Sequence, residues 1–290
     1  MKKSIFIAAM ATTLPFCGYA ATKTVSVGTF NAIKVNSYVN VAFTQGKSNK
    51  KATIEGKSNE IVADVTIEVK NGTLTIDTKN KKWKSNGKNN PRPTVTVASP
   101  EINAITINGS GDFTTSDLTS TNLEININGS GSFTANGINA SAATAKVNGS
   151  GEISIKSLKS TNTETDVNGS GDLSISDGCD CTAIITNLNG SGNLYIQGIA
   201  ATNVTASLSG SGDMRILGKS DSADIKLSRS GDLYAGNLVC GTVSAKVTGS
   251  GDLTCHASES VSTDITGSGE ITVKGGPKHV QSTGKKPNMQ

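Results

Sequence analysis

The chain has 290 residues, of which 4% are aromatic and 32 are glycine. This composition, rich in Gly, Ser, Thr and Asn, leaves too few large side chains for an ordinary compact core, whereas Val, Ile and Leu recur too regularly for a disordered chain. The formal net charge of +4 hides two opposed parts, because residues 23–100 carry 13 Lys and Arg against 5 Asp and Glu, and residues 101–274 carry 9 against 18.

Residues 1–20 are predicted to be a secretory signal peptide. Lys2 and Lys3 precede a short apolar run over residues 5–16, and small residues at positions 18 and 20 allow cleavage after Ala20. The apolar run is too short to cross a bilayer and no later segment is longer, so we expect no transmembrane segment. Export to the periplasm, the outer surface or the medium also argues against a nucleic-acid partner.

Cys17 leaves a lipoprotein as an alternative, since a lipid-anchored protein begins at a cysteine. Phe16 argues against it, because lipoprotein processing requires a small residue at that place. We therefore expect cleavage after Ala20.

Residues 21–100 are predicted to form a strand-rich N-terminal part of the domain. Residues 38–44 alternate between apolar and polar side chains, as a strand with one buried face does. Residues 65–69 and 73–77 flank the Asn71-Gly72 pair, which predicts a β-hairpin.

A basic loop is predicted at residues 79–90, between this part and the repeats. Five lysines surround the only tryptophan, Trp83: Lys79, Lys81, Lys82, Lys84 and Lys88. An aromatic ring flanked by cations suits an anionic glycan, so Trp83, Lys81, Lys82 and Lys84 are candidate ligand-binding residues. The alternative is a solvated loop that protects a sheet edge from aggregation.

A short motif recurs nine times within residues 101–274. Each copy has Asn, Ser or Thr, then Gly-Ser-Gly, then Asp, Glu, Asn or Ser, except that Arg229 replaces one first glycine. The copies begin at Asn108, Asn128, Asn148, Asn168, Asn189, Ser209, Ser228, Thr248 and Thr266. Spacings of 18 to 21 residues are typical of a solenoid. Residues 275–290 are assigned to a C-terminal tail.

Alignment of the copies places aliphatic or otherwise apolar residues in three columns. The column before the motif is Ile107, Ile127, Val147, Val167, Leu188, Leu208, Leu227, Val247 and Ile265. The column just after it is Phe113, Phe133, Ile153, Leu173, Leu194, Met214, Leu233, Leu253 and Ile271. A third column of mostly smaller residues lies two positions further. Polar neighbours give the alternation of strands with one buried face, so we predict an all-β fold, a single-stranded parallel β-helix (β-solenoid) with about 20-residue coils spaced about 4.8 Å apart.

The motif itself is predicted to form the bend of each coil. The second glycine is present in all nine copies, so we expect it to hold the demanding backbone conformation, whereas Arg229 indicates that the first site tolerates a side chain. The stacked asparagines of the first five copies are expected to form an amide ladder between coils.

Four cysteines remain after cleavage, and an even number in an exported protein suggests disulfides. Their places in the repeat argue against this. Cys255 falls in a core column, and Cys181 and Cys240 stand at equivalent places roughly 14 Å apart, beyond the reach of a disulfide. Cys179 and Cys181 would close a strained ring. We expect four small apolar residues or free thiols.

An acidic column follows the bends and includes Asp112, Asp172, Asp213, Asp232 and Asp252. Carboxylates stacked about 4.8 Å apart repel one another by roughly 3 kcal/mol at an effective dielectric constant near 20. Calcium would relieve this repulsion, which makes these five residues candidate metal ligands. The alternative is that each carboxylate accepts backbone N–H groups at its own bend. Arg229 is expected to neutralise part of the column.

Several segments together resemble one known family. They are Phe30-Asn31-Ala32-Ile33-Lys34-Val35, Gly72-Thr73-Leu74-Thr75-Ile76, Pro100 before the coils, the repeated Asn-Gly-Ser-Gly-Asp and the closing Gly276-Pro277. The combination resembles the auto-transporter adhesin head GIN domain family of exported bacterial proteins, common in Bacteroidetes, over nearly the whole mature chain. The resemblance implies a right-handed β-helix, a surface or periplasmic location and adhesion, and it carries over no catalytic residue.

These observations favour a non-catalytic exported protein, an adhesin or a cell-envelope binding or scaffold protein. Its solenoid faces would contact a cell-surface glycan or protein, self-association is compatible with them, and no cofactor is expected, with calcium as the alternative. The alternatives are a calcium-binding, β-roll-like structural protein and a polysaccharide-acting β-helix enzyme. Three arginines (Arg92, Arg215, Arg229) and two histidines (His256, His279) offer few groups that could converge in a catalytic cleft.

Overall fold

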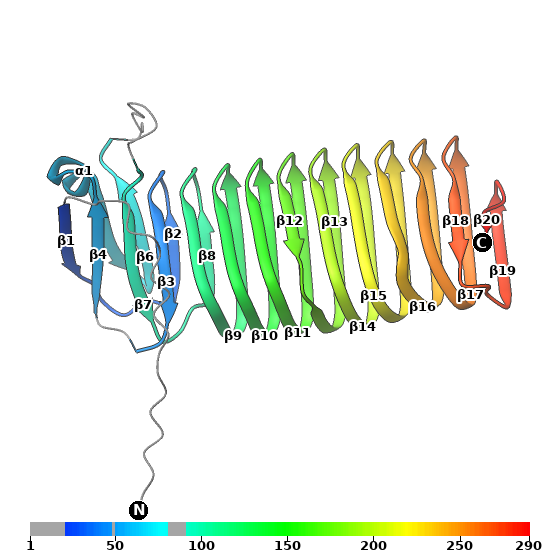
Figure 1. Cartoon of the computed structure of the whole chain (residues 1–290), viewed down its shortest axis with the longest axis horizontal. Coiled ribbons are helices and arrows are strands. Elements are labelled where there is room, and N and C mark those ends of the chain that lie inside the picture. The colour runs from blue at the N-terminus through cyan, green and yellow to red at the C-terminus, as the bar shows by residue number, and fades with distance from the viewer. Residues whose placement is uncertain (1–20, 48–49, 81–90) are drawn as a thin grey trace, which may run out of the picture.

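The computed structural model describes residues 21–47, 50–80 and 91–290. Twenty strands and one short helix account for the regular structure of these residues, and all the strands join into a single sheet. Figure 1 shows this sheet wound into a rod, with the coils from β8 to β18 stacked in chain order and their bends aligned along one edge. The fold is the predicted all-β parallel β-solenoid.

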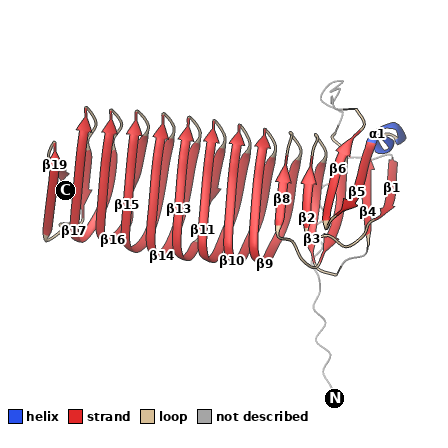
Figure 2. Cartoon of the chain, turned by 180° about the vertical axis from the view of Figure 1, so that it is seen from behind, coloured by secondary structure: helices blue, strands red, loops and turns tan. Residues whose placement is uncertain are grey.

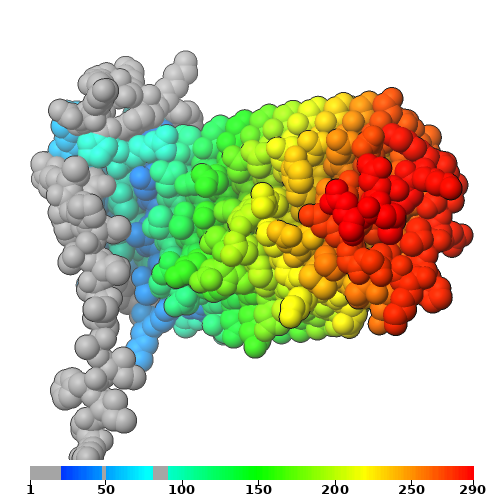
Figure 3. Space-filling view, turned by 45° about the vertical axis from the view of Figure 1, so that its right-hand side comes forward, coloured from blue at the N-terminus to red at the C-terminus, as the bar shows by residue number. Residues whose placement is uncertain are grey.

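The regular coils consist of long strands that continue through most of a coil. Their bounds are β8 (Ala104–Ile107), β9 (Asp112–Gly129), β10 (Ser132–Gly149), β11 (Glu152–Gly169), β12 (Asp172–Ile175), β13 (Cys179–Gly190), β14 (Asn193–Gly210), β15 (Asp213–Arg229), β16 (Asp232–Gly249), β17 (Leu253–Gly267) and β18 (Ile271–Lys274). Each pairs in parallel with its equivalent in the next coil, so that Phe113 faces Phe133 and Phe133 faces Ile153. The colour order along the space-filling view follows the same succession (Figure 3).

The predicted apolar columns form the core. The column before the motif is at most 3% exposed and the column after it at most 1% exposed. Further inward columns, which begin at Leu118 and Leu123, complete the filling of the coils. The rings of Phe43, Phe113 and Phe133 stack along the axis, with centroids 6.0 and 5.6 Å apart. Each coil therefore buries its side chains against the same column of its neighbours, which no isolated coil could do.

The two glycines of the motif have roles opposite to those expected. Positive φ belongs to the first glycine, as at Gly129 (φ 145°), and Arg229 adopts it too (φ 83°). The second glycine is required by close approach, because a Cβ on Gly131 would lie 2.5 Å from the carbonyl oxygen of Gly111 in the coil beneath. The expectation that the second glycine holds the demanding φ is wrong, since the demand there comes from the stacked neighbour.

The predicted amide ladder is present along the bends. Asn128 Nδ2 donates to Asn108 Oδ1 (2.9 Å), Asn148 to Asn128 (3.0 Å) and Asn168 to Asn148 (3.2 Å). Asn108 in turn donates to Asn36 Oδ1 (2.8 Å), so the ladder extends into the N-terminal part.

The N-terminal part combines parallel coils with antiparallel strands. Its bounds are β1 (Ala21–Ser26), β2 (Ala32–Val35), β3 (Asn40–Gln45), β4 (Lys51–Gly56), α1 (Asn59–Asp64), β5 (Val65–Lys70), β6 (Thr73–Thr78) and β7 (Thr94–Ser99). The β5–β6 hairpin is confirmed, with Asn71 and Gly72 both at positive φ (50° and 75°) as its turn requires.

The coils of this part are not stacked in chain order. β2 pairs in parallel with β6 on one side and β8 on the other, and β3 lies likewise between β7 and β9. Residues 32–45 therefore form a coil that lies between the later coil of β6 and β7 and the first repeat coil. Beyond the β6–β7 coil, β4, β1 and α1 complete the end of the rod (Figure 2).

At the opposite end, residues after 275 continue the stack. β19 (His279–Gly284) pairs in parallel with β17, and β20 (Asn288–Met289) pairs with β18. Val280 and Met289 are 48% and 49% exposed at this end. The segment assigned to a tail thus contributes a final coil of exposed strands.

The four described cysteines are free and buried. The Sγ atoms of Cys179 and Cys181 are 4.0 Å apart, and Cys255 lies in the core as expected. Burial raises the pKa of the Cys240 thiol to about 11 and that of the Cys255 thiol to about 12. Both therefore stay protonated at neutral pH and act as small apolar core residues.

Candidate ligand-binding face

The five predicted metal ligands all lie in one column beside the bends. Asp232 Oδ1 accepts the backbone N–H of Asp252 (3.0 Å), and Asp252 Oδ1 accepts that of Glu270 (3.0 Å). Asp172 Oδ1 accepts both the backbone N–H and the side-chain Nδ2 of Asn193 (2.9 Å each). The bonds of these three carboxylates therefore run to the next coil and not to their own bend, so each of the three also fastens two coils together.

Asp112 has different partners at the start of the column. It accepts a hydrogen bond from Ser132 Oγ (2.8 Å) and lies 3.8 Å from Arg92 Nη1. Within residues 21–47, 50–80 and 91–290, no three His, Cys, Asp or Glu side chains converge as metal ligands would. Calcium binding by the column stays a prediction. Arg229 forms no ion pair with any described residue, and its expected neutralising role stays a prediction.

The other predicted site lies outside the described residues. Lys81, Lys82, Trp83 and Lys84 all fall in the segment 81–90. The proposal that they bind a glycan stays a prediction.

A row of large side chains stands on the outer face next to the acidic column. Tyr195, Arg215 and Tyr234 occupy the same place in three successive coils, with Tyr195 paired to Arg215 and Arg215 to Tyr234. Elsewhere in the regular coils this place holds only Thr or Ser: Thr114, Thr134, Ser154, Ser174, Thr254 and Thr272. Tyr234 is 45% exposed. We call these three residues the Tyr–Arg–Tyr row.

Hydrogen bonds fix the two phenol groups of the row. Tyr195 Oη donates to Gln197 Oε1, and Tyr234 Oη donates to Asp232 Oδ2 (3.2 Å). The charge of Asp232 and this hydrogen bond raise the pKa of Tyr234, with smaller contributions from burial and from Asp213 and Asp252. Because the rings are held at their polar ends, their faces and edges remain for contact with a ligand.

A small groove of about 190 Å³ adjoins the row. Its lining includes Arg215, Tyr234, Gly236, Thr254 and Lys274. Neighbouring side chains close over Gly236, because a Cβ there would lie 2.7 Å from Thr254 Cγ2 and 3.6 Å from Lys274 Cε. The Lys274 side chain therefore lies along the face, over the coil of Thr254 and toward Gly236.

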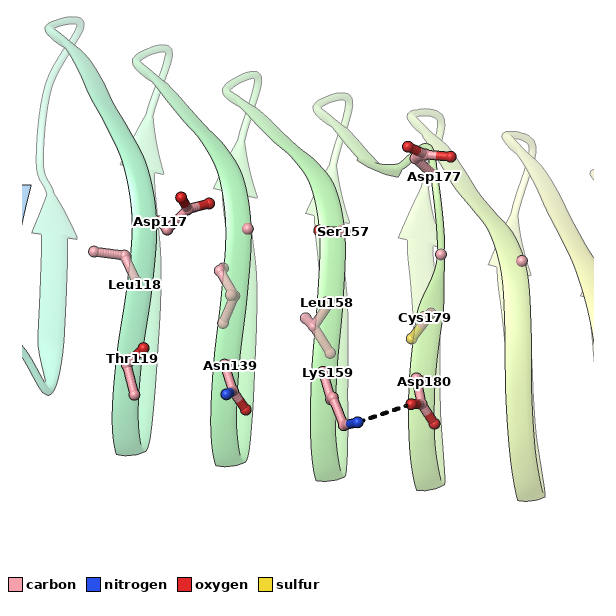
Figure 4. Close-up of a pocket in the computed structure, with 14 residues that line it drawn as sticks. Asp117, Leu118, Thr119, Asn139, Ser157, Leu158, Lys159, Asp177, Cys179 and Asp180 are labelled. Atoms are coloured by element: carbon pink, nitrogen blue, oxygen red, sulfur yellow. Dashed lines mark ion pairs between the residues drawn. The ribbon is translucent and has the colours of Figure 1, made fainter. Parts of the chain in front are cut away.

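A second hollow of about 440 Å³ lies on another face of the coils (Figure 4). Leu118, Leu158 and Cys179 line it, and Gly137 and Gly178 leave it open. Its charged residues include Lys159 and Asp180, which pair with each other at 3.5 Å. This hollow has neither an aromatic ring nor an unpaired cation in its lining, so it offers less to a polar ligand than the groove beside Tyr234 does.

The Tyr–Arg–Tyr row is visible in the aligned repeats, but it was not among the candidate sites predicted from the sequence. Tyr195 and Tyr234 break a column of Thr and Ser that stands between two apolar columns, and such a column faces outward. Two large aromatic residues in an outward column of small hydroxyl residues are a departure that the aligned repeats show directly.

The comparisons with known proteins agree with this architecture. Residues 29–184 and again 159–277 match the family described as "Putative auto-transporter adhesin, head GIN domain". The chain belongs to this family. The family's description as an adhesin implies a surface or extracellular location. No helix among the described residues is long and apolar enough to cross a membrane. The comparison with curated proteins gave no match.

Several solved structures align with 93% of this chain. A "putative adhesin" from Parabacteroides distasonis has 23% identity and a TM-score of 0.53, with 93% of this chain and 95% of that chain covered. A "putative adhesin" from Parabacteroides merdae has 19% identity and a TM-score of 0.49, with 93% and 95% covered. A "putative lipid binding protein" from P. distasonis has 22% identity and a TM-score of 0.47, with 93% and 96% covered. At these identities, the first of the three shows a shared fold alone.

Proposed function

We propose that this protein is a non-catalytic, exported adhesin that contacts a cell-surface glycan with the outer face of its solenoid. The Tyr–Arg–Tyr row carries the proposal. The exposed ring of Tyr234 and the half-buried ring of Tyr195 can present apolar faces to the C–H faces of sugars, while Asp, Gln and Arg side chains beside them exchange hydrogen bonds with sugar hydroxyls. Both kinds of group lie together on one face of adjacent coils.

The spacing of the row suggests the size of the ligand. Tyr195 and Tyr234 are two coils apart, which corresponds to about 9.6 Å along the axis. A single pyranose ring, about 5 Å across, matches one coil spacing of about 4.8 Å and would not reach both rings. An oligosaccharide or polysaccharide lying along the rod would contact both tyrosines.

The rigidity of the solenoid supports binding of an extended ligand. The row is carried by strands whose registers are fixed by parallel pairing on both sides, so little order is gained when a ligand binds. Weak contacts repeated along a polymer then increase the overall affinity, because the first contact raises the effective concentration of the polymer at the next one. A surface protein that recognises a polymer needs no deep pocket for this.

A glycan array with the mature chain tests the proposal. The test variant is Tyr195→Ser with Tyr234→Thr, which places in the row the residues that Ser174 and Thr254 supply in the flanking coils. Its Tm should stay close to that of the wild type, and glycan binding should weaken by about tenfold or more. The control is Thr134→Ala, in the same column but outside the row.

The proposal that this face binds a glycan would be contradicted if the wild-type protein bound no glycan, or if the double variant bound glycans as well as the wild type does. Pull-down of a surface protein that depends on the same two tyrosines would instead favour a protein partner, which is the second kind of contact considered for the solenoid faces.

A further inference from the structure

We infer that the sugar recognised beside Tyr234 carries an anionic group, a carboxylate or a sulfate, held between Arg215 and Lys274. The inference rests on the proposed glycan-binding function and names the chemical class of its ligand. It draws on the groove of about 190 Å³ that these two cations line together with Tyr234.

Both cations lack a partner in the part of the chain that the structure describes. Several other lysines of the regular coils are paired, although Lys156 is not: the Nζ atoms of Lys146, Lys226 and Lys246 lie 2.7, 2.8 and 2.6 Å from carboxylate oxygens. Two unpaired cations in one small groove favour an anion there, because a bound anion lowers the repulsion between them.

Tyr234 separates the groove from the acidic column. Asp232, Tyr234 and Gly236 are alternate residues of one strand, so they follow one another in a line on its outer face, with the tyrosine in the middle. Asp232 is engaged with the phenol group of Tyr234 and with the N–H of Asp252. An anion between Arg215 and Lys274 in this groove is therefore shielded from the nearest carboxylate by the ring of Tyr234.

Gly236 makes room for the side chain of Lys274. The Lys274 stem passes over this glycine, with Cδ and Cε 3.5 and 3.6 Å from where a Cβ would be, and so Lys274 lines the same groove as Arg215. The guanidinium of Arg215 supplies planar, paired N–H donors that match the two oxygens of a carboxylate or two oxygens of a sulfate. The adjacent ring of Tyr234 then contacts the sugar that carries the group.

The inference predicts different binding of anionic and uncharged polymers, and dextran sulfate and dextran share one backbone. The probes are immobilised polygalacturonate, which carries carboxylates, dextran sulfate, which carries sulfates, and uncharged dextran. The wild-type mature chain should bind at least one anionic polymer and bind dextran more weakly. Its affinity for the anionic polymer should fall as NaCl is raised from about 50 to about 500 mM, because exposed ion pairs are screened.

The test variant is Arg215→Gln with Lys274→Gln, and the control is Lys156→Gln. Lys156 is exposed and unpaired, and it stands at the same place in its coil as Lys274, three residues after the apolar column. The double variant should lose about tenfold or more in affinity for the anionic polymer and most of the salt dependence, whereas the control should change by less than about twofold.

Three results would overturn the inference. They are no binding of either anionic polymer, equal losses in the double variant and the control, and equal binding of dextran and the anionic polymers. In the last case, if Tyr234→Thr abolishes binding to all of them, the face remains a glycan site and only its preference for anions is rejected. If Tyr195→Ser with Tyr234→Thr has no effect on any glycan, the proposed function itself is rejected.

Discussion

The coil at residues 32–45 makes the same bend as the nine repeat coils, but it does so without either glycine. Asn36 occupies the place of Asn108, and Asn40 accepts the N–H of Asp112 (3.0 Å), so residues 36–40 superimpose on the motif of the next coil. The places of the two glycines are taken by Ser37 and Val39. The bend itself therefore does not require glycine.

The difference shows where the requirement for glycine arises. A Cβ on Gly111 would lie 2.1 Å from the carbonyl oxygen of Val39, because the bend of the repeat coil lies directly on the one before it. The coil on the other side of residues 32–45 joins β6 to β7 through residues 79–93, which contain no such motif. Glycine is needed only where one bend stacks on another.

The largest expected effect separates steric crowding from backbone conformation. Gly151→Ala places a Cβ 2.5 Å from Ile127 Cγ2 and 2.6 Å from the oxygen of Gly131, so it should lower the free energy of unfolding by about 3–5 kcal/mol. Gly178 has φ +135° and nothing within 4 Å, so Gly178→Ala should cost about 1–2 kcal/mol.

Gly46→Ala is the matched control, with neither crowding nor positive φ, and should change stability by less than about 0.5 kcal/mol. Thermal denaturation followed by circular dichroism measures all three. Equal losses for Gly151 and Gly46 would contradict the stacking explanation.

The amide ladder allows the two regions to be compared directly. Asn148 makes two ladder bonds, to Asn128 and from Asn168, whereas Asn36 is the last rung and accepts only from Asn108. Asn148→Ala should therefore cost about 2 kcal/mol and Asn36→Ala about half of that, at about 1 kcal/mol per bond. Denaturant titration measures both values. A larger loss at Asn36 would mean that the ladder stabilises the N-terminal coil in some further way.

A cross-coil ion cluster gives the repeat region a dependence on pH. Lys146 Nζ lies 2.7 Å from both Glu164 and Asp166, and hydrogen bonds with them raise the pKa of Lys146 to about 12. Burial alone would raise the pKa of Asp166, but hydrogen bonds from Lys146 and Asn187 outweigh it and lower that pKa. The stabilisation from Asp166 is present above the ordinary carboxyl pKa of about 3.9 and is lost as pH falls below it.

The contribution of Lys146 has the opposite sign and is present below its ordinary pKa of 10.5, then lost as pH rises toward about 12. Lys146→Met should lower the free energy of unfolding by about 1 kcal/mol near neutral pH, with the deficit vanishing toward pH 2. Lys34→Met, on the exposed face of the 32–45 coil where Lys34 has no ion pair, is the control. A deficit independent of pH would point to lost packing instead of charge.

The smallest expected effect concerns calcium. Asn40, which is uncharged, accepts the next coil's N–H as Asp232 and Asp252 do, so the bond does not depend on a negative charge. We therefore expect millimolar calcium, or a chelator, to change Tm by less than about 1 °C. A rise of several degrees that the chelator reverses would establish the acidic column as a calcium site.

The repeat made most of the fold predictable. Nine copies fix which residues share a column, and that suffices to identify a solenoid, its register and its core. The same method missed the coil at residues 32–45, because Ser37 and Val39 hide the motif there. It also misassigned the two glycines, since the contact that demands the second one comes from a neighbouring coil and leaves no mark on the local sequence.

The site was harder to predict for a similar reason. Trp83 and its lysines were predicted as a site because they form a charged cluster of residues that are adjacent in the sequence. Tyr195, Arg215 and Tyr234 are about 20 residues apart and become neighbours only when the coils stack. Arg229 was expected to neutralise part of the acidic column from its place in the repeat alone, but which atoms a long side chain meets depends on its backbone conformation and rotamer, which the pattern does not contain.

The order in which the coils stack has a consequence for the time course of folding. Within the repeats, a ladder bond closes a loop of 20 residues, but the bond between Asn36 and Asn108 closes one of 72. Loop closure over the longer distance costs about 1 kcal/mol more, from the logarithm of the ratio of the two lengths. The coil of residues 32–45 also pairs with β6 and β7, which come later in the sequence, so it cannot be completed before they are available. We therefore expect a chain that emerges from a membrane N-terminus first to begin assembling among its repeats, where each coil becomes the template for the next. The segment that emerges first would then be among the last to become ordered.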